Sequence, residues 1–270
     1  MPKKLRWLII GLSSLAILAA CAPAGESDGG AEPPAAEAPA VEEMEAAPDE
    51  EMAVVGGLCA HPYFPALEGT TWSYAGEADG AAYAFEDTII ERREDGFTMS
   101  SDFGDVTQNL AWECSEDGLV ALSYGGGGAA SVSARDFAFT MNTLEVTGVT
   151  LPAEILPGDT WEQTYIIEGT QVLDGEQFGT MEGSAVIFYT AVGMETISVS
   201  AGEFSGLHIR REITLDFTVS VMDLTIPTVM VLAENTWFVE GVGMVYSEGS
   251  GTLDEFAFDT TLELQEYTFP

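Results

Sequence analysis

Apolar and polar side chains alternate with a period of two in several stretches of the chain. In residues 213–221 every second side chain is apolar, and the side chains between them are threonine, aspartate or serine. Residues 255–265 repeat the pattern with Thr260 in the apolar phase, and so do residues 106–114, where Gln108 is the exception. Because successive side chains of a strand point to opposite faces, each stretch is predicted to be an amphipathic β-strand.

Dipeptides that favour tight turns separate such stretches. Asp-Gly begins at Asp79, Asp95, Asp117 and Asp174, and Ala201–Gly202 is predicted to be a further hairpin turn. No segment past the first twenty residues shows a capped helical period, and 29 Gly with 12 Pro favour turns over helices. The predicted fold of residues 57–270 is all-β: a single large curved antiparallel sheet or half-barrel, with little or no helix outside the N-terminal leader.

The first twenty residues have the order of a secretory signal peptide. Three basic residues lie at positions 3, 4 and 6, and an apolar run from Trp7 to Ala20 follows them. The run ends in Leu-Ala-Ala-Cys, which resembles the lipobox of bacterial lipoproteins. That resemblance implies that Cys21 carries diacylglycerol and becomes the mature N-terminus. A signal cleaved without lipidation, or a short retained anchor, is the alternative, although neither requires a cysteine there.

Residues 21–56 are predicted to be the lipidated cysteine followed by a disordered acidic linker. Positions 22–56 hold ten Ala, five Pro and ten acidic residues and no aromatic one. Such a composition cannot bury enough apolar surface to offset the entropy of ordering the chain. The linker would hold residues 57–270, the β-rich extracytoplasmic domain, away from the membrane. The signal peptide and lipobox predict that the protein is located in the cell envelope, on the outer membrane or the outer face of the cytoplasmic membrane.

The charge is strongly negative. The chain has 45 acidic and 8 basic residues, and cleavage before Cys21 removes three of the basic ones and none of the acidic ones, which leaves a formal charge of −40. A nucleic-acid partner is therefore not expected, because the protein would repel phosphate. The surface would attract cations, including divalent ions bound nonspecifically. The same acids also serve to keep an exported domain soluble.

Two cysteines remain after Cys21 is lipidated. Cys59 and Cys114 are predicted to form a disulfide, because an exported compartment permits the bond and exposed thiols there tend to oxidise. Two separate thiols are the alternative. A bond would close a loop of 55 residues and pin the start of the domain to an inner strand.

Four residues are candidates to face a ligand. Trp72, Trp161 and Trp237 each follow a turn signal and are predicted to open a strand, where they would line a pocket or anchor the core. Arg211 shares the phase of Leu207, Ile209 and Ile213, so it would point inward and need a partner unless a bulge turns it outward. That partner is either an acidic side chain of the protein or an anionic ligand group.

Three segments resemble a group of uncharacterised bacterial envelope lipoproteins. Residues 63–74 are similar to their opening YxPLxxGxxWxY, residues 199–209 to a VPAGxFxxLxI hairpin, and residues 237–245 to a WxxxGVGxV ending. Ser200 departs from the usual proline, and Tyr246 from a frequent lysine. The resemblance implies a curved antiparallel sheet, a half-barrel like the lipoprotein-carrier folds, and brings no established activity.

No catalytic residues, metal ligands or cofactor are predicted. The two histidines, His61 and His208, have no spacing that suggests a shared metal, and neighbouring carboxylates such as Glu86 and Asp87 point to opposite faces of a strand. We therefore expect a lipid-anchored, non-enzymatic protein that binds an apolar ligand or an envelope partner. A structural surface spacer without a small ligand is the alternative, and a glycan-acting hydrolase is a weaker one.

Overall fold

The structure is a computed structural model that describes residues 56–104, 106–125, 139–173 and 176–270. The predicted signal peptide, Cys21 and all of the predicted linker except Gly56 lie outside these residues. Within them no helix is long and apolar enough to cross a membrane.

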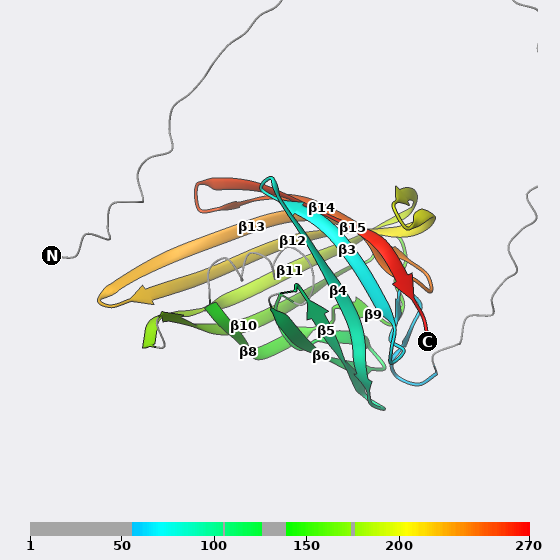
Figure 1. The fold of residues 1–270 in the computed structure, drawn as a ribbon, viewed down its shortest axis with the longest axis horizontal. Helices are drawn as coiled ribbons and strands as arrows, with labels where there is room; N and C mark the ends of the chain where they lie inside the picture. Colours follow the sequence, from blue (N-terminus) through cyan, green and yellow to red (C-terminus); the bar gives the residue numbers. More distant parts are fainter. Residues whose placement is uncertain (1–55, 105, 126–138, 174–175) are drawn as a thin grey trace, which may run out of the picture. The chain divides into compact units, whose positions relative to one another are not determined.

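Every regular element of the described residues is a β-strand, and Figure 1 shows their arrangement. The strands are β1 (Ala60–His61), β2 (Phe64–Pro65), β3 (Thr71–Ala78), β4 (Ala81–Arg92), β5 (Gly96–Asp102), β6 (Thr107–Ser115), β7 (Gly118–Ala121), β8 (Phe139–Gly148), β9 (Leu151–Pro152), β10 (Thr160–Leu173), β11 (Glu176–Val199), β12 (Gly202–Val221), β13 (Leu224–Val239), β14 (Gly243–Leu253) and β15 (Phe256–Thr268).

β1 and β2 pair with each other, and the other thirteen strands form one sheet in the order β8-β10-β11-β12-β13-β14-β15-β3-β4-β5-β6-β7-β9. All of its pairings are antiparallel. The sheet curls into a half-barrel with a concave inner face, so the predicted fold class is confirmed.

The alternating stretches are strands with one buried face, as predicted. In β12, Ile213 and Leu215 are buried while Thr214 and Asp216 are exposed. In β6 the buried side chains are Leu110, Trp112 and Cys114, and in β15 they are Thr260, Leu262 and Leu264. Two apolar residues at the ends of these stretches, Val106 and Phe256, are exposed.

The predicted turns are found where the structure describes them. Asp79 and Gly80 join β3 to β4 with φ values of 48° and 77°, the positive pair that a tight hairpin requires. Asp95 and Asp117 lie in the turns before β5 and β7, whereas Asp174 lies outside the described residues. The hairpin between β11 and β12 turns at Ser200–Ala201, one residue earlier than predicted, and Gly202 opens β12.

The two ends of the strand order come together at a short segment. β8 pairs with β10 at one end of the sheet, β9 pairs with β7 at the other, and only Val149 and Thr150 separate β8 from β9. Thr150 contacts both sides. Its amide donates to the Leu119 carbonyl (3.0 Å or less, at 2.9 Å), and its hydroxyl donates to Gln163 Oε1 on β10 (3.1 Å). The segment therefore closes the curl at this level of the sheet.

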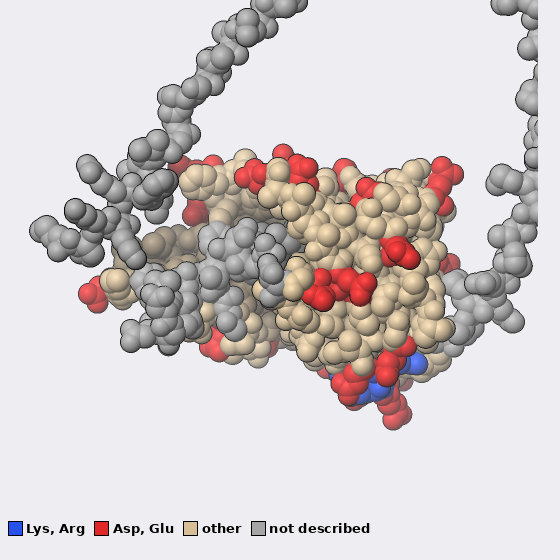
Figure 2. Space-filling model, viewed as in Figure 1, with Lys and Arg blue, Asp and Glu red and all other residues tan. Residues whose placement is uncertain are grey.

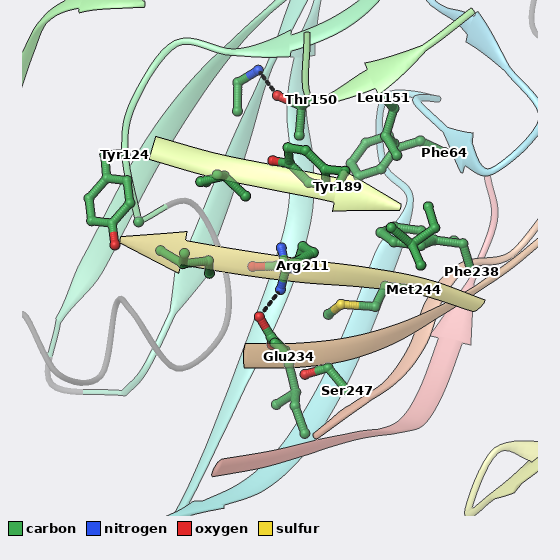
Figure 3. A pocket seen from close by; sticks show the side chains of 18 of the residues that line it. Phe64, Tyr124, Thr150, Leu151, Tyr189, Arg211, Glu234, Phe238, Met244 and Ser247 are labelled. Atoms are coloured by element: carbon green, nitrogen blue, oxygen red, sulfur yellow. Dashed lines mark hydrogen bonds and ion pairs between the residues drawn. The ribbon is translucent and has the colours of Figure 1, made fainter. Parts of the chain in front are cut away.

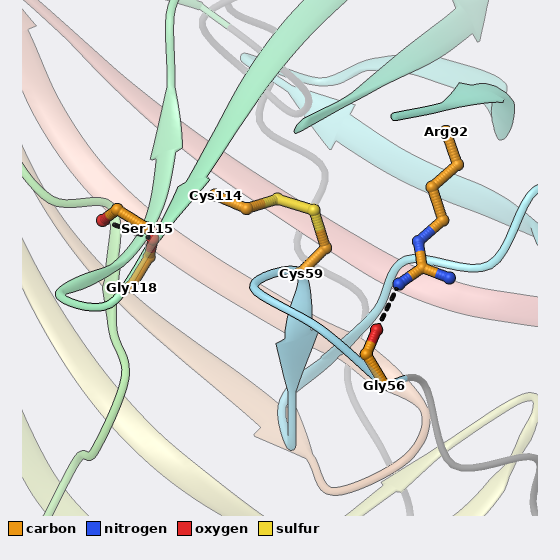
Figure 4. Close-up of a disulfide and its surroundings, with 6 residues drawn as sticks. All are labelled: Gly56, Cys59, Arg92, Cys114, Ser115 and Gly118. Carbon is orange, nitrogen blue, oxygen red and sulfur yellow. Dashed lines mark hydrogen bonds between the residues drawn. A yellow bond between two sulfur atoms is a disulfide. The ribbon is translucent and has the colours of Figure 1, made fainter. Parts of the chain in front are cut away.

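The predicted disulfide between Cys59 and Cys114 is confirmed, with Cα atoms 5.0 Å apart (Figure 4). It ties the segment before β1 to β6, and both cysteines are buried. Close by, Arg92 donates a hydrogen bond to the carbonyl of Gly56 (2.7 Å). The start of the folded region is thus held at two points against the short-stranded half of the sheet.

Acidic side chains are spread over the face seen in Figure 2, while the cationic side chains visible there gather at one place. Two of the ion pairs join exposed neighbours, Arg93 with Glu91 and Arg210 with Glu212. Exposed pairs contribute little stability, so we assign these two pairs no large part in holding the fold.

Candidate functional site

A cavity of about 140 Å³ opens on the concave face of the sheet. Most of its lining is apolar or aromatic, which is usual for a ligand pocket. The aromatic residues that line it are Phe64, Trp72, Tyr74, Trp112, Tyr124, Tyr165, Tyr189 and Phe238, and the charged ones are Asp87, Arg211 and Glu234. Figure 3 shows that Arg211 and Glu234 approach each other beside Tyr189, Met244 and Ser247.

Strand register places three of these residues side by side. Tyr189 of β11 lies opposite Arg211 of β12, and Arg211 lies opposite Glu234 of β13. Directly opposed residues of antiparallel strands point to the same face of a sheet. The phenol, the guanidinium and the carboxylate therefore form a row across three neighbouring strands on the inner face.

Arg211 and Glu234 form an ion pair through Arg211 Nη2 and Glu234 Oε2. Burial is the largest single influence and lowers the pKa of Arg211. The charge and hydrogen bond of Glu234, together with Tyr189 and Tyr124, outweigh it, so the pKa lies above its ordinary value. The side chain of Glu234 keeps only 5% of its surface exposed and that of Arg211 keeps 24%. Of the two partners that the sequence left open for Arg211, the structure provides the acidic side chain.

Three polar atoms of the lining are buried without a hydrogen-bond partner among the described residues: Arg211 Nε, Tyr124 Oη and Trp112 Nε1. Buried polar atoms are normally paired, so each of these needs a reason. All three belong to residues that line the cavity, but the atoms themselves have almost no accessible surface and are closed off from it.

The tyrosines of the lining are held protonated. Burial raises the pKa of Tyr189 to about 12, with Arg211 acting in the opposite direction. Burial likewise raises the pKa of Tyr124 and of Tyr165. Tyr189 donates to Gln163 Oε1 (3.2 Å) and Tyr165 donates to the Ala121 carbonyl (3.1 Å). At neutral pH all three phenols keep their protons, and Tyr189 and Tyr165 use theirs as hydrogen-bond donors.

Asp87 is a second polar centre that the sequence analysis passed over. It is 6% exposed, lies opposite Trp72 of β3 and Ser101 of β5, and accepts a hydrogen bond from the Ser101 hydroxyl. Burial raises the pKa of Asp87 to about 7, and the hydrogen bond from Ser101 offsets part of that rise. Glu86 and Asp87 do point to opposite faces of β4: Glu86 lies on the exposed outer face and Asp87 on the buried inner face. Its phase with Phe85 and Ile89 was the signal that could have found it.

The three candidate tryptophans have different places. Trp72 lines the cavity, and its indole nitrogen donates to the Val242 carbonyl (2.6 Å). Gly243 comes close to this ring, since a Cβ there would lie 3.3 Å from Trp72 Nε1. Trp161 stacks on Tyr189 with ring centroids 5.0 Å apart and is not part of the lining.

Trp237 lies on the other face. It has the opposite phase to Glu234 and Thr236, stacks on His208 with centroids 4.5 Å apart, and donates to Glu195 Oε2 (3.1 Å). The sequence predicted that Trp237 opens a strand, and this is wrong, because it lies two residues before the end of β13. A ligand in the cavity would therefore meet Trp72 and Arg211, but neither Trp161 nor Trp237.

No group of three or more His, Cys, Asp or Glu side chains in the described part of the chain is arranged to hold a metal ion. His61 is buried near the start of the sheet, where its Nε2 lies 2.9 Å from the Pro152 carbonyl. His208 is hydrogen-bonded to Glu195 and Asn235. The two histidines thus have separate surroundings.

Fold and cavity together define the class of protein: a curled antiparallel half-barrel with a small, mostly apolar pocket on its inner face. No family model matches the sequence, and no curated protein matches it. Among solved structures, a Bacteroides fragilis protein described as exported, with a YmcC-like fold, is similar. It is 15% identical with a TM-score of 0.49, over 77% of this chain and 100% of that one.

Two further solved structures are similar. A Parabacteroides distasonis protein described as a lipoprotein is 14% identical with a TM-score of 0.49, over 77% of this chain and 99% of that one. The hypothetical lipoprotein YmcC of Escherichia coli K12 is 12% identical with a TM-score of 0.35, over 76% and 87%. At these identities and scores we draw no conclusion about function from the similarity.

Proposed function

We propose that the protein is a lipid-anchored extracytoplasmic binding protein, without enzymatic activity, that takes a small and mostly apolar ligand into the cavity of its half-barrel. The observation that carries the proposal is the cavity itself, with a lining that is mostly apolar and aromatic. An interior that only had to be packed would gain stability from filling this cavity with side chains.

The volume limits the size of the ligand. Pockets for drug-sized molecules measure about 300–1,000 Å³, whereas an apolar cavity of about 150 Å³ is large enough to bind benzene. At about 140 Å³, the cavity matches a ligand of benzene size. A whole lipid does not fit inside it.

The anchor is proposed from the sequence. Cys21 follows a leader of the secretory type and the Leu-Ala-Ala of a lipobox, and the mature chain would then begin at a diacylated cysteine. Two acyl chains on one cysteine suffice for stable membrane attachment, because each buried methylene contributes about 0.8 kcal/mol. Labelled palmitate fed to the host should reach the wild-type protein and not the Cys21→Ser variant. Equal labelling of both would overturn the anchor.

A binding role fits the chemistry of the lining better than catalysis. Arg211 is neutralised by Glu234, and the pKa values of Tyr124, Tyr165 and Tyr189 are raised, so these groups hold their protons. Asp87 is the group that titrates near neutral pH, and its hydrogen-bonded neighbour Ser101 is fully buried. Neither residue has a described histidine beside it to complete a nucleophilic pair.

Native mass spectrometry of the full-length protein from its own host tests ligand binding. We expect an additional small mass that is lost in Ala121→Leu, because Ala121 lines the cavity and a larger side chain there would fill it. Ala84→Leu is the matched control, since Ala84 is an exposed residue of β4. It should keep the additional mass.

A structural spacer of the cell surface is the second candidate, favoured by a cavity smaller than most ligand pockets. It predicts no additional mass in the wild type and a higher melting temperature for Ala121→Leu, since filling an empty cavity stabilises a core. That combination of results would overturn the binding proposal.

A further inference from the structure

The cavity contains a carboxyl group whose hydrogen bonding is incomplete. Asp87 lies between Trp72 and Ser101 in the register of β3, β4 and β5, and Ser101 donates to its Oδ1. None of the described residues donates a hydrogen bond to Oδ2. Burying a carboxylate costs free energy unless both of its oxygens are paired. A hydrogen-bond donor or a cation at Oδ2 would therefore stabilise the ionised form of Asp87.

The other charged groups of the cavity already cancel. Arg211 and Glu234 form an ion pair within the row that spans β11, β12 and β13. Asp87 is the remaining charged residue of the described lining. An anionic ligand would find no uncompensated positive charge there, whereas a cation would find one uncompensated carboxylate.

Aromatic rings line the cavity next to Asp87 and farther along the sheet. Trp72 is the direct cross-strand neighbour of Asp87, and Phe64 lies 5.7 Å from Trp72 and 5.0 Å from Trp112, measured between ring centroids. All three rings line the cavity. The faces of aromatic rings attract cations, and rings of this kind are used to bind quaternary ammonium groups.

Resting on the binding function proposed above, we propose that the ligand is a small organic ammonium ion, held by the carboxylate of Asp87 and by the rings of Trp72 and Phe64. A trimethylammonium group is of benzene size, so the cavity volume of about 140 Å³ suits it. The formal charge of −37 on the whole chain would draw such a cation towards the protein.

Binding should be linked to one proton. Burial raises the pKa of Asp87 to about 7, so the empty site is largely protonated under mildly acidic conditions. An ammonium ion stabilises the carboxylate, and the carboxyl proton leaves to the solvent. Facing Asp87 are Trp72 and Tyr74 from β3 and Ser101 from β5, and the pKa of Tyr74 is raised by burial and by Asp87 itself. None of these three titrates in the same range, and Glu86 points to the outer face.

Isothermal titration calorimetry of the full-length protein in a non-ionic detergent provides the test, with choline as the cation and dimethylbutanol as its uncharged carbon isostere. We expect choline to bind more tightly, with an affinity that rises about tenfold per pH unit below the pKa of Asp87 and levels off above it, as one released proton requires. The affinity for dimethylbutanol should not depend on pH.

The variant Asp87→Asn should weaken choline at least tenfold at pH about 8 and leave dimethylbutanol unchanged. Glu86→Gln is the matched control, because it removes the neighbouring charge on the outer face, and it should leave both affinities unchanged. If Asp87→Asn does not fold, Ser101→Ala serves in its place. Loss of the hydroxyl raises the pKa of Asp87, so the pH at which choline binding levels off should move upward.

Equal affinities for choline and dimethylbutanol would overturn the ammonium proposal and leave small-ligand binding standing. Undiminished choline binding by the Asp87→Asn variant would likewise overturn the ammonium proposal and leave small-ligand binding standing. If neither molecule binds and the native mass spectrum shows no additional mass, the binding function itself fails.

Discussion

Phe97 in β5 and Phe256 in β15 both point to the inner side of the sheet, yet Phe97 has no exposed surface and Phe256 keeps 77% of its surface exposed. The ring of Phe97 stacks on Trp112 at 5.4 Å and on Phe64 at 5.4 Å. Phe64 comes from β2, which is not part of the large sheet. The inner face is buried here because a separate segment covers it.

The long hairpins extend beyond the part of the inner face that β2 covers. β12 and β13 extend beyond the neighbouring hairpins in Figure 1, and at their tip Val221 pairs with Leu224, which is 60% exposed. Leu224 and Phe256 occupy inward positions in the alternating pattern, just as Phe97 does. The comparison shows that alternation reports which side of a strand faces inward, while burial depends on what lies opposite that side.

The largest effect is expected at the covered end. Phe97→Ala should lower the free energy of unfolding by about 3–5 kcal/mol, because it removes a buried ring and leaves a hole between Phe64 and Trp112. Chemical denaturation followed by tryptophan fluorescence measures the change. A loss under about 1 kcal/mol would mean that the covered end is no better packed than the hairpin tips.

Asp87, on the same inner face, should make the free energy of unfolding depend on pH. Its pKa is about 7 in the folded protein, against about 3.9 for an unperturbed aspartate. Between these values the folded state holds a proton that the unfolded state has lost, so this group makes the protein less stable as the pH rises from about 4 to about 7. The total change is on the order of 4 kcal/mol.

The Asp87→Asn variant isolates this contribution from those of the other carboxylates. Relative to wild type, the variant should gain stability between pH about 5 and about 8, and Glu86→Gln should show no such gain. Denaturation midpoints at the two pH values measure it. A constant difference between wild type and Asp87→Asn would contradict the raised pKa.

The disulfide should matter mainly to the covered end. Replacing both Cys59 and Cys114 by alanine removes a link that closes a loop of 55 residues, and loop entropy gives an upper limit of about 4 kcal/mol for its contribution. Hydrogen exchange should then speed up in β1, β2 and β6 more than in β12 and β13. If hydrogen exchange became faster to the same extent in all strands, the disulfide would not stabilise the covered end more than the long hairpins.

The smallest effect is expected at the tip of the β14–β15 hairpin. Phe256→Ala should change the free energy of unfolding by no more than about 0.5 kcal/mol, because most of the ring already contacts water. The measurement is the one used for Phe97→Ala, with the same pair of residue types. A loss comparable to that of Phe97→Ala would show that Phe256 is packed against something.

The sequence predicted the strands, the turn at Asp79–Gly80 and the disulfide because each depends on local pattern or on a small number of cysteines. It also predicted that Arg211 points inward, although it could not choose the partner, because Glu234 lies 23 positions away and only strand register brings the two together. The cavity was not predictable in the same way, since its lining comes from strands throughout the sheet order.

The contrast between Arg211 and Asp87 is instructive. Both carry a charge in the apolar phase of a strand, but only Arg211 was singled out, since arginine is rare in this chain and aspartate is common. Strand phase was the informative signal in both cases. Trp237 shows the converse, because a large aromatic residue near a turn lies on the outer face and contacts His208.

The segment Val149–Thr150, where β8 gives way to β9, has a mechanical consequence. The Thr150 hydroxyl accepts a hydrogen bond from the Ala121 amide, and the Thr150 carbonyl accepts one from the Trp161 indole. Thr150 also donates to the Leu119 carbonyl and to Gln163. A pulling force across this seam would be borne by the short β7–β9 pairing and the bonds of Thr150, whereas the other pairings of the sheet distribute load along longer strands. The sheet should therefore separate first between β7 and β9, and single-molecule stretching would register that rupture before the long hairpins separate.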